Sequence, residues 1–222
     1  MTLNILLNGV VKMRVLVTGF EPYGKENYNP SKEIALKLDG KEINGSKIFG
    51  AEMPVSYRRI RDALITKIEE IKPQIVINLG LAPGVSYIRV ERVAINIMDA
   101  GPDNDGYRPI DKPIELNGPP AYFATIPIKK IVKELKENGI PAAISNSAGT
   151  FLCNCIMYHT LHYISTKKLK AIAGFIHIPY IPRQAAEKER YPPPSLPLTL
   201  IERAVKIAIK TSLDSWNEKF MK

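Results

Sequence analysis

The 222-residue chain has only two cysteines, three histidines and one tryptophan, and it lacks any long hydrophobic run. Cys153 and Cys155 stand two positions apart, which excludes a disulfide framework of the kind found in small secreted proteins. No apolar run reaches the length of a transmembrane helix, and the segment from Met1 to Met13 lacks the basic region and cleavage site of a signal peptide. We therefore expect a cytoplasmic protein with no membrane partner, in which residues 1–12 form an N-terminal extension and Met13 is a candidate start.

The chain also lacks the signatures of a nucleic-acid-binding protein, although its formal net charge is +9. Lysines and arginines occur as pairs within amphipathic patterns, with acidic residues between them, rather than in a basic patch with aromatic residues. There is no zinc knuckle, no aromatic RNA-binding motif and no heptad repeat. Hydrophobic residues make up 45% and charged residues 24% of the chain, as in an ordinary globular protein. We expect one domain spanning residues 1–222 and no nucleic-acid partner.

Apolar strand patterns alternate with helical patterns along the chain. The expected strands are residues 14–18, 48–55, 74–79, 88–98, 142–145 and 171–178. The expected helices are residues 31–38, 57–71, 128–138 and 198–215, and a helix that carries Cys153 in its first turn and runs to about Tyr163. Ser56 is expected to cap the second helix. Strands separated by helices predict an α/β fold, with an open, mainly parallel, twisted sheet covered by helices on both faces in three layers.

One long segment, residues 101–120, breaks this alternation. It has prolines at 102, 109, 113, 119 and 120 around the sequence Asp-Asn-Asp-Gly at 103–106, so no regular element fits. Loops of this length in compact domains are usually functional or disordered. We expect a lid over the site or an arm that contacts a neighbouring subunit.

The most informative short motif surrounds Cys153. Residues 145–155 read Ser-Asn-Ser-Ala-Gly-Thr-Phe-Leu-Cys-Asn-Cys, which predicts a turn through Gly149 into a helix whose first turn carries Cys153. Unpaired amides and the positive end of the helix dipole lower the pKa of a cysteine at such a position, and the thiolate is a nucleophile. A small hydrophobic core residue would also explain an isolated cysteine. The interpretation therefore depends on the neighbours of Cys153.

His177 supplies a candidate base. In an open α/β sheet, ligands bind outside the carboxyl ends of the strands, where the following helices aim their N-termini. Cys153 follows the strand 142–145, and His177 lies near the end of the strand 171–178, so both are predicted at this edge. A hydrogen-bonded core histidine would explain His177 alone, but the two residues together fit a thiol and its general base.

Glu91 is a candidate to orient the imidazole. It lies within the expected strand 88–98, where alternation puts Val93 and Ile95 on its face. A glutamate in apolar surroundings is rarely buried without a partner. An ion pair with Arg89 or Arg92 explains Glu91 as well as a catalytic role does, and both interpretations stay open on spacing alone.

Four segments together resemble the pyroglutamyl peptidase type I family, also called pyrrolidone carboxyl peptidases. These are residues 15–24 (Val-Leu-Val-Thr-Gly-Phe-Glu-Pro-Tyr-Gly) with Asn-Pro-Ser at 29–31, residues 91–96 (Glu-Arg-Val-Ala-Ile-Asn), residues 145–154, and residues 174–180 (Gly-Phe-Ile-His-Ile-Pro-Tyr). The resemblance runs from about Met13 to the last helix. It implies a cysteine peptidase that removes an N-terminal pyroglutamyl group from peptides.

The resemblance also implies roles for single residues. Cys153 would be the nucleophile, His177 the general acid and base, and Glu91 the residue that orients His177. The ring-binding wall would consist of Phe20, Tyr23 and Phe151, with Asn29 supporting it. An aromatic pocket suits an uncharged lactam, and the expected thioester chemistry requires no metal or cofactor. The family commonly forms tetramers, so we expect a homo-oligomer.

The sequence departs from the family pattern at two positions. Members usually carry an arginine after the glycine-rich turn and another after Asp-Ala, and this chain has Val85 and Gly101 there. One residue is also missing before Pro102. The second arginine would lie near the scissile carbonyl, so these differences bear on turnover and peptide preference.

Two further motifs suggest other kinds of site. Residues 19–25 nearly match a phosphate-binding loop, but Glu26 stands where a magnesium-binding hydroxyl is needed and Pro22 removes an amide donor. Cys155, His159 and His162 share one helical face and suggest a metal site, although we expect no metal because such pairs more often cover a helix face.

Ser147 lacks the flanking glycines of a serine nucleophile. We therefore expect it to lie in the turn that positions Cys153. A non-catalytic homologue that binds a lactam or another small ligand on the same fold is the alternative to a peptidase.

Overall fold

The computed structural model describes residues 12–188 and 191–221. A seven-stranded sheet has the order β2-β3-β1-β4-β9-β5-β8, and β6 and β7 form a separate two-stranded sheet. The strands are β1 (Arg14–Phe20), β2 (Glu42–Ile43), β3 (Ser46–Met53), β4 (Ile75–Leu81), β5 (Ile88–Glu91), β6 (Val93–Ile95), β7 (Ala121–Phe123), β8 (Ala142–Ser145) and β9 (Ile172–Ile178). The helices are α1 (Pro30–Leu38), α2 (Ile60–Ile71), α3 (Ile128–Glu137), α4 (Leu152–Thr166), α5 (Pro182–Ala186) and α6 (Leu198–Phe220).

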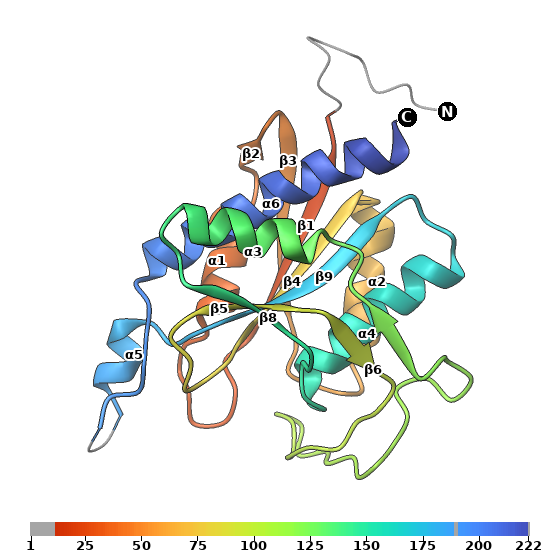
Figure 1. Ribbon diagram of the computed structural model, residues 1–222. Helices are drawn as coiled ribbons and strands as arrows, with labels where there is room; N and C mark the ends of the chain where they lie inside the picture. The colour runs from red at the N-terminus through yellow and green to blue at the C-terminus, as the bar shows by residue number, and fades with distance from the viewer. Residues whose placement is uncertain (1–11, 189–190, 222) are drawn as a thin grey trace.

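Helices cover both faces of the large sheet, which confirms the predicted three-layer α/β fold (Figure 1). One apolar core joins the sheet to α1, α3 and α6, and a second joins the opposite face to α2 and α4. The central strands β1, β4 and β9 are buried almost throughout. Such continuous apolar runs are what a sheet covered on both faces requires. Among the described residues, no helix is both long and apolar enough to cross a membrane.

The expected long strand 88–98 is wrong, because it is two strands in different sheets. β5 belongs to the large sheet, the chain leaves that sheet at Arg92, and β6 pairs with β7 instead. Glu91 is therefore fully buried, whereas Ile95, expected on the same buried face, is 36% exposed. The alternation pattern could not reveal this change of partner, since both strands keep extended backbone.

The start of the second helix also differs from the prediction. α2 begins at Ile60 and has Arg59 at its N-cap, so Ser56 is not the cap. The Ser56 hydroxyl accepts a hydrogen bond from the Arg59 amide at 3.2 Å and donates to Asp105 at 2.6 Å. Ser56 thus orders the turn before the helix and ties it to the long loop.

Strand direction is the correction that matters most for the site. β9 is parallel to β4, but β5 is antiparallel to β9, and β8 is parallel to β5. The carboxyl ends of β8 and β9 therefore point in opposite directions, and do not meet at one edge as expected. Through Glu91, Ser145 at the end of β8 lies about level with Phe175, two residues before His177 on β9.

Residues 101–120 form no helix or strand, as expected, but they are extensively hydrogen-bonded. The Asp103 carboxylate accepts bonds from the amides of Tyr57, Asp105 and Tyr107. The Asn104 amide donates to Glu21 and to the Pro22 carbonyl. These contacts hold the start of the loop against the segments that follow β1 and β3.

Candidate active site

His177 and Glu91 form the buried centre of the site. The Nδ1 atom of His177 lies 2.8 Å from Oε1 of Glu91, and the two side chains are 9% and 0% exposed. Of the two arginines considered as ion-pair partners of Glu91, Arg89 lies farther away, at 3.7 Å, and Arg92 donates to Asn146 instead. The closest charged contact of Glu91 is therefore the imidazole.

Cys153 reaches this pair from the first turn of α4. The first backbone bond into this helix runs from the Cys155 amide to the Phe151 carbonyl at 3.1 Å, so the amides of Leu152, Cys153 and Asn154 precede the helical ladder. Cys153 is half-buried, and its sulfur lies close enough to His177 to act on the pKa of the imidazole. Because Glu91 engages Nδ1 of His177, Nε2 is the nitrogen available to the thiol.

Gly80 makes room for the sulfur. It lies opposite His177 in the pairing of β4 with β9. A Cβ atom built on Gly80 would lie 2.8 Å from Sγ of Cys153 and 2.6 Å from the Phe175 ring, closer than real contacts allow. The close approach of helix and strand at this glycine is what brings Cys153 to His177, despite the opposite directions of β8 and β9.

The pKa of His177 reflects this environment. Burial alone would lower it, but the neighbouring Cys153 sulfur and the Glu91 carboxylate more than offset burial and raise the pKa of His177 to about 9. An imidazole with a raised pKa beside a thiol favours the thiolate–imidazolium form. This arrangement can supply a nucleophile and a proton donor together.

The next residue of the helix, Asn154, links Cys153 to the strand that follows Glu91. Its fully buried side chain accepts a bond from the Ile95 amide at 2.9 Å. It donates to the carbonyls of Ile95 and Ile97 at 2.8 and 3.1 Å. The start of α4 is thereby tied to the chain immediately beyond β5.

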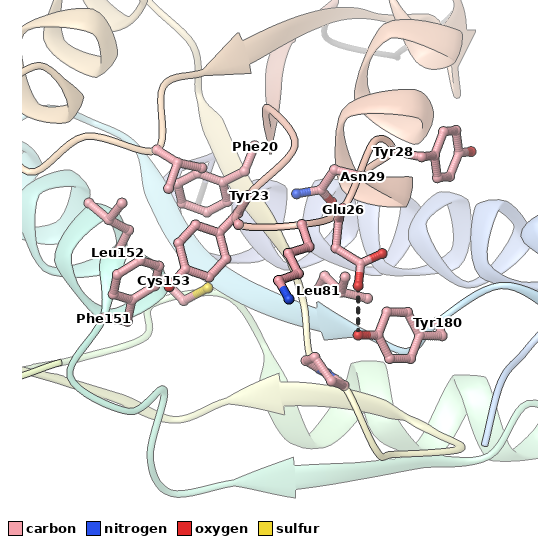
Figure 2. Close-up of a pocket in the computed structure, with 14 residues that line it drawn as sticks. Phe20, Tyr23, Glu26, Tyr28, Asn29, Leu81, Phe151, Leu152, Cys153 and Tyr180 are labelled. Atoms are coloured by element: carbon pink, nitrogen blue, oxygen red, sulfur yellow. Dashed lines mark hydrogen bonds between the residues drawn. The ribbon is translucent and has the colours of Figure 1, made fainter. Parts of the chain in front are cut away.

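A cavity of about 380 Å³ opens beside Cys153 (Figure 2). The candidate wall residues Phe20, Tyr23, Phe151 and Asn29 all line it. The Tyr23 and Phe151 rings lie 4.9 Å apart between centroids, close to Cys153. Most of the other lining residues are apolar, so the cavity suits an uncharged, compact group.

The side chain of Asn29 holds the backbone segment between Phe20 and α1. Its side-chain oxygen accepts bonds from the Ser31 amide and hydroxyl and caps α1, while its amide donates to the Glu21 carbonyl at 3.1 Å. These bonds fix the segment between Phe20 and α1, which forms one wall of the cavity. Asn29 thus holds the backbone of this wall in place.

The positions that depart from the family pattern differ in their relation to the cavity. A Cβ atom built on Gly101 would lie 3.7 Å from the Tyr23 hydroxyl, so Gly101 stands beside the aromatic wall. The same hydroxyl donates to the Pro102 carbonyl at 3.3 Å. Val85 is half-buried, and neither Val85 nor Gly101 is among the residues that line the cavity.

The residues of the suggested metal site have separate surroundings. His159 contacts Glu115 at 3.3 Å, and His162 is hydrogen-bonded to the Tyr122 hydroxyl at 2.9 Å. Cys155 is fully buried in the core between α4 and α2, and burial raises the pKa of its thiol. Across the described ranges, histidine, cysteine and acidic side chains form no group of three that could hold a metal ion.

The structure also shows the surroundings of residues 19–25 and of Ser147. The helix after residues 19–25 begins only at Pro30, so this segment does not lead directly into a helix as a phosphate-binding loop does. Ser147 is exposed, and its hydroxyl accepts a bond from the Gly149 amide at 3.2 Å. It lies in the turn before α4, and Gly149 has the positive φ of 77° that this turn requires.

Sequence reasoning missed three residues of the site. Gly80 has no local signal, because its constraint comes from a helix far away in the chain. Asn154 stands beside the nucleophile but was not singled out. Tyr57 was expected within a helix, yet its ring packs edge-on against Phe151 with centroids 5.6 Å apart. Asn154 lies inside a motif and could have been singled out as a polar residue beside the nucleophile, whereas Tyr57 lies far from every motif and has no such signal.

An α/β sheet that brings a thiol at a helix N-terminus to an imidazole held by a buried carboxylate defines the thiol hydrolase class of site. The profile of the Pyroglutamyl peptidase family matches residues 13–215, and the chain belongs to this family. A pyrrolidone-carboxylate peptidase of Pyrococcus furiosus is 50% identical over 91% of this chain and 99% of its own length. One of Thermococcus litoralis is 49% identical over 90% of this chain and 93% of its own length.

The fold comparison agrees. The solved structure of the pyrrolidone carboxyl peptidase from Thermococcus litoralis superposes with a TM-score of 0.91 at 48% identity, and it covers 93% of this chain and 96% of that one. The resemblance inferred from the four motifs is therefore confirmed.

Proposed function

We propose that this chain is a cysteine peptidase that hydrolyses the bond after an N-terminal pyroglutamyl residue. The observation that carries the proposal is the buried contact of 2.8 Å between His177 and Glu91 beside the half-buried Cys153. Family membership supports the substrate class. The aromatic cavity next to Cys153 suits a lactam ring.

In the proposed mechanism, the Cys153 thiolate attacks the pyroglutamyl carbonyl carbon and a C–S bond forms. Amides at the start of α4 stabilise the negative charge that develops on the carbonyl oxygen. His177 then protonates the departing nitrogen as the C–N bond breaks, which leaves a thioester on Cys153. His177 next takes a proton from water, the resulting hydroxide attacks the thioester, and pyroglutamate leaves as Cys153 becomes a thiolate again. Glu91 orients the imidazole and stabilises its charged form throughout.

Hydrolysis of a pyroglutamyl anilide tests this function. We expect release of the amine by the wild type and no release after Cys153→Ala or after treatment with iodoacetamide. Wild-type protein that binds pyroglutamate but releases no amine would instead establish the alternative, a non-catalytic lactam-binding homologue.

We also propose that the chain acts in the cytoplasm as a homo-oligomer. Both cysteines are free, as expected in a reducing compartment. Ile110 and Leu116 in the long loop are 69% and 87% exposed, and Phe123 on β7 is 69% exposed. Large apolar side chains exposed in this way suit a subunit contact. Light scattering of the purified protein tests the tetramer, and a monomeric mass would refute it.

A further inference from the structure

Arg89 stands beside the proposed catalytic residues but has no role in the mechanism above. It lies directly opposite His177 in the pairing of β5 with β9, and two positions before Glu91 on the same strand. All three side chains therefore share one face of the sheet. Nε of Arg89 lies 3.7 Å from Oε1 of Glu91, and the arginine side chain is 28% exposed.

Arg89 also contacts the turn that leads to Cys153. Its Nη2 atom donates to the Ser145 hydroxyl at 2.9 Å and to the Ser147 carbonyl at 3.5 Å. Ser145 is in turn paired with Glu91 across the β5–β8 ladder. One guanidinium thus connects the carboxylate with the segment that positions the nucleophile.

The carboxylate of Glu91 needs a counter-charge in every protonation state of the site. It is fully buried, and its Oε2 atom has no hydrogen-bond partner within the described ranges. When His177 is protonated, the imidazolium balances the carboxylate. After His177 has given its proton to the leaving amine, the Arg89 guanidinium is the cation that still contacts Glu91. A buried carboxylate without a partner would be strongly destabilised.

We propose that Arg89 is a positioning residue that keeps Glu91 ionised and oriented while His177 is neutral, and that anchors the Ser145–Ser147 turn before Cys153. The inference rests on the proposed function, because it assigns Arg89 to the same catalytic cycle. With Arg89 present, a thiolate, an imidazolium, a carboxylate and a guanidinium sum to zero charge.

The sign of the effect follows from the groups that face this site. They are Cys153 from α4, His177 from β9, and Arg89 and Glu91 from β5. β8 contributes the uncharged Ser145, and the phenols of Tyr23 and Tyr57 lie on the Cys153 side. A nearby cation lowers the pKa of both a thiol and an imidazole. Removing the Arg89 charge leaves the group with a net charge of −1. We therefore expect the titration of the Cys153–His177 pair to move to higher pH, by about one unit.

The experiment compares Arg89→Met and Arg89→Lys with a matched control, Arg92→Met, which removes a cation from the same chain segment without touching Glu91. The first readout is the rate of Cys153 alkylation by iodoacetamide as a function of pH, with the modified peptide identified by mass spectrometry. This readout needs no substrate. The second is the pH profile of kcat/KM on a pyroglutamyl anilide.

We expect Arg89→Met to move the alkylation midpoint and both limbs of the activity profile to higher pH by about one unit. Arg89→Lys, which keeps the charge, and Arg92→Met should keep the wild-type midpoints. Unchanged midpoints in Arg89→Met, or an equal shift in Arg92→Met, would overturn the proposal. If Arg89→Met does not fold, Arg89→Gln removes the same charge and carries the same test. A wild type that hydrolyses no pyroglutamyl substrate would refute the proposed function, whereas the alkylation midpoints would still decide the role of Arg89.

Discussion

Two buried histidines, His159 on α4 and His177 on β9, are paired with carboxylates, yet their pKa values shift in opposite directions. His177 is 7% exposed and lies beside Glu91, and its pKa is raised to about 9. His159 is 5% exposed and lies beside Glu115, and its pKa is lowered to about 4. Burial is nearly equal, so the difference must come from the charges that face each ring.

The difference lies in how many anions each imidazole has and how strongly they act on it. Burial lowers the pKa of both rings, but His177 faces both the Cys153 sulfur and a carboxylate that is fully buried. Glu115 is 24% exposed and also contacts Arg61 at 3.2 Å, so part of its charge is already balanced. A carboxylate partner alone is therefore not evidence of a catalytic histidine. The distinguishing features are the second anion beside the His177 ring and the two basic residues, Arg61 and His162, that lower the pKa of His159.

The largest expected effect distinguishes the two cysteines of α4. Cys153→Ala should lower kcat/KM by about 10,000-fold, since it removes the nucleophile. Cys155→Ala, on the core side of the same helix, should keep kcat within about twofold and lower the free energy of unfolding by about 1 kcal/mol through the small cavity that it leaves. Kinetics on a pyroglutamyl anilide and urea denaturation measure both effects. A large loss of activity from Cys155→Ala with the fold intact would contradict the assignment.

The two carboxylates give the next test. Glu91→Gln removes the anion that orients and charges His177, so we expect kcat/KM to fall roughly 100-fold or more. The alkaline limb of the pH profile should also move to lower pH, because the imidazolium loses a stabilising neighbour. Glu115→Gln should leave kcat/KM unchanged, since Glu115 faces the other histidine. Equal losses from the two variants would show that carboxylate pairing does not distinguish the two sites.

A substitution at Gly80 should move the pKa of His177 toward that of His159. The Cβ atom of Gly80→Ala would lie 2.8 Å from Sγ of Cys153, so the sulfur must move away. Without its second anion, His177 should have a lower pKa, and kcat should fall about tenfold or more because the thiol no longer meets its base in the right geometry. A matched variant is Gly139→Ala, remote from the site at the end of α3, which should affect stability through its positive φ of 72° but not the pH profile. An unchanged pH profile in Gly80→Ala would argue against the role given to the sulfur.

These residues also mark what the sequence could predict. The motifs around Cys153, His177 and Glu91 were sufficient to propose a thiol, a base and an orienting carboxylate, and alternating periodicities were sufficient for a three-layer α/β fold. The geometric reason for uniting Cys153 and His177 was nevertheless wrong, because β8 runs antiparallel to β9. Strand direction depends on long-range pairing, which local patterns do not encode.

The same limit explains the errors around Glu91. Only Arg92 separates β5 from β6, so the periodicity could not show that β5 ends and that β6 joins another sheet. Spacing also left Arg89 and His177 as equal candidate partners of Glu91. Only the three-dimensional distances, 2.8 Å against 3.7 Å, distinguish them.

The smallest expected effect concerns stability in acid. The pKa of His159 is about 4 in the folded chain and 6.5 in its ordinary state. The unfolded chain therefore binds the proton more readily between these values, so the contribution of His159 to stability is intact above pH 6.5 and is lost as the pH falls toward 4. By linkage the loss is on the order of 3 kcal/mol at most. His159→Gln cannot take up this proton, so its free energy of unfolding should fall less than that of the wild type between about pH 7 and about pH 4. Urea denaturation at several pH values measures the difference. The contributions of all other titrating groups cancel in this difference, because both proteins contain them. If the free energy of unfolding falls equally with pH in both proteins, His159 is not held neutral by its surroundings. The proposed contrast between His159 and His177 would then be wrong.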